Sequence, residues 1–106
     1  MGRSVRPRPL RLGKKLLIIR RALGLTQEAM LARLGTVSGL THSSISGYEL
    51  GTREPPLLVL LEYANIANVH LEALADDNLD LPHEIPSPKK HAGIKRVRGK
   101  NKLKGS

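Results

Sequence analysis

The chain has 106 residues, a formal net charge of +9 and a pI near 10.5, and it contains no cysteine, phenylalanine or tryptophan. This length allows one small domain with extensions and argues against a large catalytic cleft, since a segment of about 70 residues buries only about 60% of its unfolded surface. The lack of cysteine excludes disulfides, zinc–thiolate fingers and thiol nucleophiles, and it agrees with a reducing cytosol. Because Tyr48 and Tyr63 are the only aromatic residues, we expect no stacking platform for single-stranded nucleic acid.

The positive charge lies at the two ends of the chain. Residues 1–21 and residues 89–104 each hold eight lysines and arginines. All nine acidic residues lie between Glu28 and Glu84, where only two arginines oppose them, so this middle part carries a charge of about −7. The two ends therefore predict attraction to a polyanion.

Residues 1–10 contain alternating arginine and proline and show no helical repeat, so they predict a flexible basic arm. Two interpretations stay open: an arm that contacts phosphate or the minor groove, and a solvated tail. Apolar residues at helical spacing then predict a first helix that Gly24 ends, with Leu12, Leu16, Ile19 and Leu23 on one face. Lys14 and Lys15 lie off this face, and we expect both to contact DNA phosphate. No apolar run here is long enough to span a membrane.

Between Thr26 and Gly51, two short helical patterns are separated by a glycine-bearing turn. Thr26 is a candidate N-cap, and Gly35 stops a helix whose apolar face holds Met30, Leu31 and Leu34. Thr41 is the second candidate cap, before a helix that Gly51 ends.

The second of these helices has two unlike faces. One face carries Ile45, Tyr48 and Glu49. The opposite face is small and polar, and it is formed by His42, Ser43, Ser46 and Gly47. Such a face can approach a major groove closely and present donors and acceptors to base edges, as a recognition helix must.

The runs LTQEAMLARLG and SSISGYELGTREPPLLVLLEYANIANVHLEAL resemble the Cro and phage-repressor type of helix-turn-helix, also called the xenobiotic-response-element family. The resemblance covers roughly Leu12 to Pro82, about two-thirds of the chain. It implies an all-α fold, a compact five-helix lambda-repressor-like DNA-binding domain, here with flexible basic N- and C-terminal extensions.

The resemblance also implies roles for individual residues. Arg20 matches an arginine that pairs with the glutamate of the recognition helix, here Glu49. Gln27, with Thr26 beside it at a helix N-terminus that favours anions, matches a phosphate contact, and so does Arg53. The base-facing positions are His42, Ser43, Ser46 and Gly47, and none of them is an arginine or asparagine, so we expect modest direct readout of bases.

Two departures from the family pattern alter the expected geometry. Leu31 stands where the family usually has alanine, which implies a shifted helix crossing. The turn between Gly35 and Ile45 is about four residues longer than the compact pattern, with Val37 to Leu40 as the insertion. Either Leu40 packs into the core, or Ser38 caps an extra turn of helix.

Glu54 and the following prolines open a fourth helix, whose expected core face is Leu57, Leu60, Leu61 and Ala64. Asn68 closes this helix, and His70 is the candidate cap of a short fifth helix. Four further apolar residues could form a homodimer contact or belong to the core: Leu58, Val59, Leu79 and Leu81.

Residues 83–106 are rich in proline, glycine and basic residues and predict a disordered basic tail after a domain spanning 11–82. Its interpretations include added phosphate contacts, a solubility tail and an RNA or membrane-surface anchor. We predict no catalytic residue, cofactor or metal site, because no nucleophile elbow, phosphate-cradling signature or complete calcium loop is present; Asp76, Asp77 and Asp80 are expected to form a solvated acidic turn.

The sequence therefore predicts a cytoplasmic, nucleoid-associated transcriptional regulator without enzymatic activity, expected to be a repressor, that binds double-stranded DNA with the helix near residues 42–50 in the major groove. Two alternatives remain: a protein-interaction or antitoxin-like module on the same scaffold, and nonspecific nucleic-acid binding through the basic ends.

Overall fold

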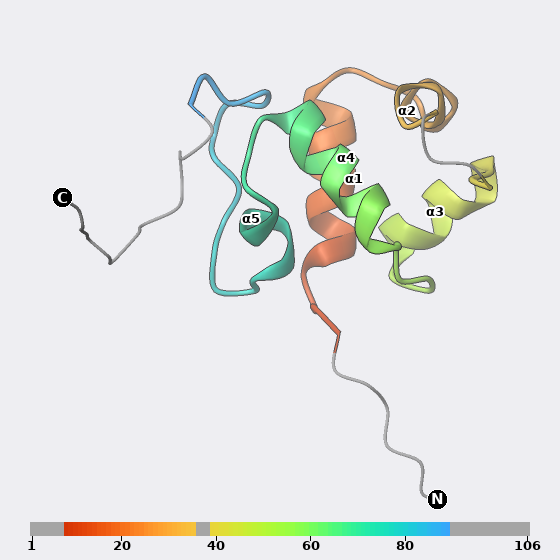
Figure 1. The fold of residues 1–106 in the computed structure, drawn as a ribbon, viewed down its shortest axis with the longest axis horizontal. Coiled ribbons are helices and arrows are strands. Elements are labelled where there is room, and N and C mark those ends of the chain that lie inside the picture. The colour runs from red at the N-terminus through yellow and green to blue at the C-terminus, as the bar shows by residue number, and fades with distance from the viewer. Residues whose placement is uncertain (1–7, 36–38, 90–106) are drawn as a thin grey trace, which may run out of the picture.

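The computed structural model describes residues 8–35 and 39–89. Five α-helices and no strands form this part of the chain (Figure 1). In chain order the helices are α1 (Leu12–Ala22), α2 (Gln27–Arg33), α3 (His42–Leu50), α4 (Leu57–Ala67) and α5 (Leu71–Ala75). The helices α2 and α3 lie together on one side of the molecule, on the right in Figure 1, while α5 and the segment after it lie on the other.

The helix ends follow the local sequence signals. Thr26 caps α2 by accepting a hydrogen bond from the backbone N–H of Ala29 at 3.0 Å. Thr41 and Ser44 form a reciprocal capping box at the start of α3, in which each side chain accepts from the other residue's backbone N–H. Asn68 ends α4 in the left-handed conformation, with a φ of 57°.

One apolar core joins all five helices, and it contains Leu12, Leu16, Ile19, Met30, Leu34, Ile45, Tyr48, Val59, Leu60, Tyr63, Ala64, Ala67, Val69, Ala73 and Leu74. The predicted core face of α1 is present, although Leu23 is only partly buried.

The predicted core face of α4 is wrong in part. Leu57 and Leu61 are 65% and 43% exposed, whereas Val59 and Tyr63 are fully buried. The first five residues of α4 are all apolar, so the hydrophobic pattern alone does not define which side faces inward. The buried position of Val59 also removes it from the predicted dimer contact.

Gly13 lets α1 approach the C-terminal end of α3 closely. A Cβ atom at this position would lie 2.8 Å from the carbonyl oxygen of Tyr48 and 2.9 Å from that of Glu49. Only glycine leaves room for this contact between the two helix backbones.

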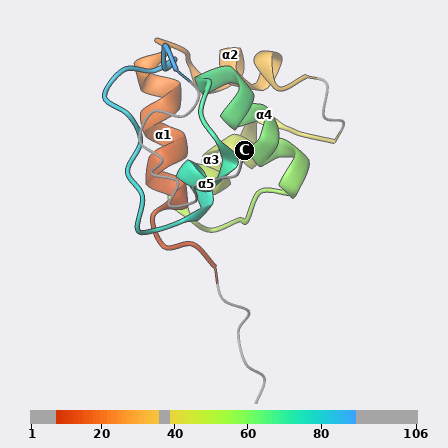
Figure 2. The same cartoon turned by 60° about the vertical axis from the view of Figure 1, so that its left-hand side comes forward.

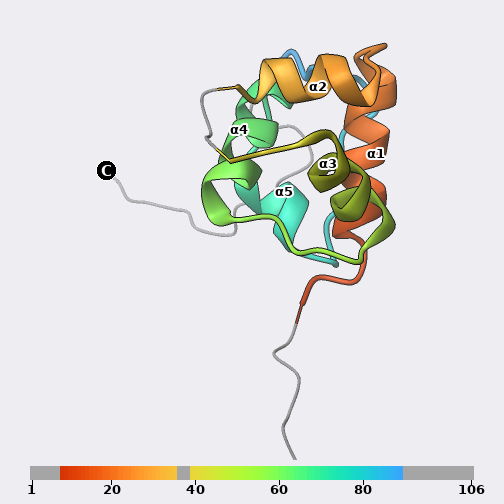
Figure 3. The same cartoon turned by 90° about the vertical axis from the view of Figure 1, so that its right-hand side faces the viewer.

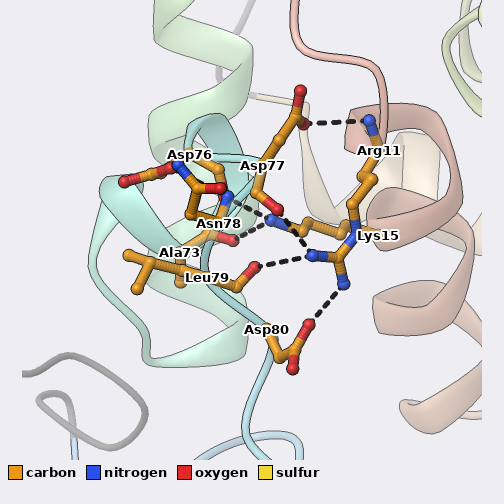
Figure 4. A network of polar contacts seen from close by, with 8 residues as sticks. All are labelled: Arg11, Lys15, Ala73, Asp76, Asp77, Asn78, Leu79 and Asp80. Atoms are coloured by element: carbon orange, nitrogen blue, oxygen red, sulfur yellow. Dashed lines mark hydrogen bonds and ion pairs between the residues drawn. The ribbon is translucent and has the colours of Figure 1, made fainter.

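Lys15 does not lie on the surface, so the expectation that it contacts phosphate is wrong. Its side chain is 2% exposed, and its Nζ donates to the carbonyl oxygens of Ala73 at 2.8 Å and Asp76 at 2.9 Å (Figure 4). These carbonyls lie at the C-terminal end of α5, where an ammonium group satisfies backbone acceptors. Burial lowers the pKa of Lys15, and the nearby Arg11 lowers it further.

The acidic turn after α5 is more than a solvated turn, because it holds the start of α1. The carboxylate of Asp77 accepts from the backbone N–H groups of Leu10 at 2.9 Å and Arg11 at 3.0 Å. Figure 4 shows the contact of Arg11 with Asp77 and its ion pair with Asp80. The N-cap residue of α1, Arg11, makes no side-chain capping hydrogen bond. Asp77 therefore supplies the missing acceptor from 66 residues away.

The domain extends beyond the predicted boundary at residue 82. The segment after α5 runs alongside α1 and reaches the C-terminal end of α4 (Figure 2). There the backbone N–H of Ser87 donates to the carbonyl of Ala67 at 2.9 Å, and the Asn68 side chain donates to the Ser87 carbonyl at 2.6 Å. Ile85 packs against the core. Residues 83–89 thus belong to the folded unit, and the rest of the predicted tail, 90–106, lies outside the described residues, as do residues 1–7 of the predicted arm.

The contact between Asp77 and the start of α1 predicts a specific acid sensitivity. Hydrogen bonds from the backbone of Leu10 and Arg11 lower the pKa of Asp77 below its ordinary value of 3.8 in the folded state. This carboxylate therefore stabilises the fold fully above about pH 4, and the contribution is lost as the pH falls through 3.8 toward the lower folded-state pKa. We expect Asp77→Asn to flatten the fall in unfolding free energy in this range, measured by urea titration at pH 2.5 to 6.

The exposed Glu28 provides the matched control, because Glu28→Gln also removes one carboxylate. If Asp77→Asn and Glu28→Gln changed the pH profile equally, Asp77 would have no special part in holding α1.

Candidate nucleic-acid interface

The inward face of α3 fixes this helix against the rest of the domain. Ile45 is fully buried and Tyr48 is 5% exposed, both within the core. On the side where α2 and α3 lie, shown facing the viewer in Figure 3, α3 lies at the surface below α2. The rest of α3 is therefore presented outward on a rigid support.

A buried polar cluster joins α1, α2 and α3. Arg20 and Glu49, the pair that the resemblance implies, form a two-point ion pair: Nε lies 2.6 Å from Oε2, and Nη2 lies 3.1 Å from Oε1. The side chains are 14% and 5% exposed. Gln27 on α2 donates to the same carboxylate at 3.1 Å. The carboxylate of Glu49 thus connects α3 to both α1 and α2.

Tyr63 carries a buried polar group close to this cluster, and the sequence did not predict it. The side chain is fully buried, and its hydroxyl has no hydrogen-bond partner among the described residues. Burial, and after it the charge of Glu49, raise the pKa of Tyr63. An unpaired buried hydroxyl costs about 1–3 kcal/mol, which the packing of the ring offsets.

The outward face of α3 agrees only in part with the expected base-facing set. His42 and Ser43 are exposed, and Ser46 is partly exposed. Gly47 is buried, so its place in the base-facing set is wrong. Leu50, 74% exposed, is an additional residue that sequence reasoning missed, although helical spacing from Ser43 and Ser46 places it on this face.

Arg53 covers Gly47. A Cβ atom on Gly47 would lie 2.9 Å from both Cγ and Cδ of Arg53 and 3.2 Å from its Cβ. The aliphatic part of the arginine therefore occupies the space that any larger residue at position 47 would fill. Its Nη1 lies 3.4 Å from the hydroxyl of Ser44, one turn nearer to the start of α3.

The candidate phosphate contacts flank α3 on two sides. On one side, Thr26 and Gln27 lie at the start of α2, where backbone N–H groups favour an anion, although the Gln27 side chain already donates to Glu49. On the other side, an open hollow of about 430 Å³ is lined by the basic side chains of Arg8, Lys14 and Arg53, together with acidic and apolar residues. Lys14 is exposed, unlike its neighbour Lys15.

The long turn before α3 is described only from residue 39 onward. Leu40 is partly buried and packs against the core, as one of the two interpretations requires. Ser38, on which the other depends, lies outside the described residues. Leu31 also packs against the core, so the residue that departs from the family's alanine contributes apolar contacts.

No group of three or more histidine, aspartate or glutamate side chains is placed to hold a metal ion within residues 8–35 and 39–89. In the same ranges no helix has both the length and the apolar character to cross a membrane.

A family model described as helix-turn-helix matches residues 16–74, more than half of the chain. The chain belongs to this Cro/C1-type helix-turn-helix family, whose fold is the lambda-repressor-like all-α domain and whose members are DNA-binding transcription regulators. Comparisons with curated proteins and with solved structures give no match.

The buried ion pair predicts an asymmetric effect of substitution. Arg20→Met should lower the free energy of unfolding by about 3–5 kcal/mol, because it leaves the Glu49 carboxylate buried without its cation. The double variant Arg20→Met/Glu49→Met should be more stable than this single variant, since it removes both charges. Urea denaturation of the four proteins of the double-mutant cycle measures both effects.

Arg21→Met serves as the control, because Arg21 is exposed on the same helix. A loss of under 1 kcal/mol for Arg20→Met, similar to that of Arg21→Met, would contradict a structural role for the pair.

Proposed function

We propose that this protein binds double-stranded DNA sequence-specifically, with α3 in the major groove, and that it acts as a transcriptional repressor. The observation that carries this proposal is the outward face of α3, on which small polar side chains are accessible while the inward face is fixed in the core. A helix of about 10–12 Å diameter fits a major groove about 12 Å wide, and small side chains allow a close approach.

His42, Ser43 and Ser46 are the proposed base-reading residues of α3 itself. Both nitrogens of a histidine ring can serve a purine edge, and a serine hydroxyl can donate or accept. His42 and Ser43 lie in the first turn of α3, the part of a recognition helix that contacts base edges in helix-turn-helix complexes.

Phosphate contacts on both sides of α3 would fix its orientation. Thr26 and Gln27 at the start of α2 provide one contact, and Lys14 beside the open hollow provides the other. The basic residues near the ends of the chain add an attraction that does not depend on sequence. Since DNA is the ligand, we place the protein in the cytoplasm, associated with the nucleoid. We propose repression because a protein of this kind that is bound at a promoter would exclude polymerase without needing any activating contact.

Selection of binding sites from a random duplex library tests this function. Full-length protein at near-physiological salt should enrich one reproducible motif. The variant His42→Ala/Ser43→Ala/Ser46→Ala should lose the motif, because these three side chains supply the base contacts of α3 itself. Circular dichroism of the variant checks that α3 remains folded.

Removal of residues 90–106 is the contrasting variant in the same experiment, since it leaves the folded residues 83–89 in place. It should retain the motif, weaken binding to all DNA alike and reduce the salt dependence of affinity, because it removes seven basic residues. A motif that survived the triple substitution would contradict base reading by α3, and binding without any motif would favour nonspecific association.

We further propose that the protein binds as a two-fold homodimer through the exposed leucines of α4. Leu58 is 64% exposed, and Leu57 and Leu61 are also exposed on the same helix. These three leucines form the proposed contact, and the buried Val59 is not part of it. Leu79 and Leu81 are partly buried, and Leu81 packs against the core of its own chain. The same exposed leucines favour the alternative of a protein-interaction module.

Leu58→Ser should therefore shift the protein toward monomer in analytical ultracentrifugation, because it removes apolar area from the centre of this surface. It should also weaken binding to a two-half-site duplex more than to a single half-site. Ala75, exposed on α5, offers a control position, as Ala75→Ser changes an exposed residue on a different helix. A wild-type protein that is monomeric both free and on DNA would contradict the dimer.

A further inference from the structure

We propose that Arg53 reads a guanine in the major groove, and that the glycine at position 47 leaves the space that the arginine side chain needs to reach it. The inference rests on the proposed function, in which α3 enters the groove. It assigns to Arg53 a different role from the phosphate contact that the family resemblance implies.

The backbone around Arg53 is held firmly to α3. The carbonyl oxygen of Gly47 accepts from the backbone N–H groups of Thr52 at 3.0 Å and Arg53 at 3.2 Å, and also from the hydroxyl of Thr52 at 3.3 Å. The start of the arginine side chain is thus fixed relative to the recognition helix.

The side chain then runs along α3, not away from it. Its Cβ, Cγ and Cδ lie over Gly47, and its Nη1 reaches to 3.4 Å from the Ser44 hydroxyl. This direction leads toward the first turn of α3, where His42 and Ser43 are exposed. The aliphatic part of the side chain occupies space over α3 that only a glycine at position 47 leaves open.

The chemistry of the guanidinium completes the outward face. The exposed side chains of α3 contain no arginine, lysine, asparagine or glutamine, and these are the residues that form the strongest bidentate contacts with purines. A guanidinium presents a planar fork of donors that matches O6 and N7 of guanine. The contact with Ser44 is long for a hydrogen bond, so the guanidinium can exchange this partner for a base edge.

The test uses the DNA site that wild-type protein selects, together with duplexes in which each base pair is changed in turn. Affinities are measured by fluorescence anisotropy at several salt concentrations. Four variants are compared: Arg53→Ala, Arg53→Lys, Gly47→Ala and, as a phosphate-type control, Lys14→Ala.

If Arg53 reads guanine, one G·C pair in each half-site should lose its preference by about 10- to 100-fold in Arg53→Ala and in Arg53→Lys, because a lysine lacks the planar fork. Gly47→Ala should lose the same preference while its salt dependence stays that of wild type, because its Cβ displaces the stem but keeps the charge. Alanine favours helix over glycine, so α3 stays formed in this variant. Lys14→Ala should weaken binding to every duplex alike and retain all base preferences.

Other results would overturn the inference. If Arg53→Ala weakened all duplexes equally, with a salt slope lower by about one and every base preference retained, Arg53 would be a phosphate contact. The inference would also be refuted if no G·C pair of the selected motif lost its preference in Arg53→Ala. The same holds if Gly47→Ala kept the wild-type preference for that G·C pair. These outcomes leave the proposed function intact if the motif still depends on His42, Ser43 and Ser46. The absence of any selected motif in the wild-type protein would instead refute the proposed function itself.

Discussion

The placement of α3 depends on one carboxylate. Glu49 lies on α3, and it accepts from Arg20 on α1 and from Gln27 on α2 within 3.1 Å. Two charges removed from water stabilise a fold only when their geometry is good and their remaining hydrogen-bonding groups are satisfied, and the two-point pairing with a third donor meets this condition. Because the three side chains belong to three helices, a shift of α3 would break the whole cluster at once.

Each end of α1 holds another part of the fold in place by polar contacts. Near its C-terminal end, Arg20 fixes α3, and nearer its N-terminal end, Lys15 and Arg11 fix α5 and the acidic turn through backbone carbonyls and carboxylates. Gly13, which lies between Arg11 and Lys15, allows α1 to lie against the backbone of α3. The small core leaves little apolar burial for specificity, so these polar contacts define how the helices are arranged around it.

The sequence predicted the features that depend on neighbours along the chain, and it failed where distant segments decide. The caps at Thr26 and Thr41 need only the following three residues, and both were predicted. Lys15 looks solvent-exposed from its helix alone, because the carbonyls that bind it come from a segment 58 to 61 residues away. Gly47 looked base-facing for the same reason, since only the folded loop brings Arg53 over it. In α4, the continuous apolar run at its start does not indicate which side of the helix faces the core.

The most direct test of the account is a nuclear magnetic resonance titration of isotope-labelled full-length protein with the selected duplex at near-physiological salt. If α3 enters the major groove, the largest changes in backbone and side-chain signals should fall on the first turn of α3, on Arg53 and at the start of α2, while signals of α5 stay nearly unchanged. Changes confined to the chain ends or to α5, with α3 unaffected, would contradict the placement of α3 at the DNA.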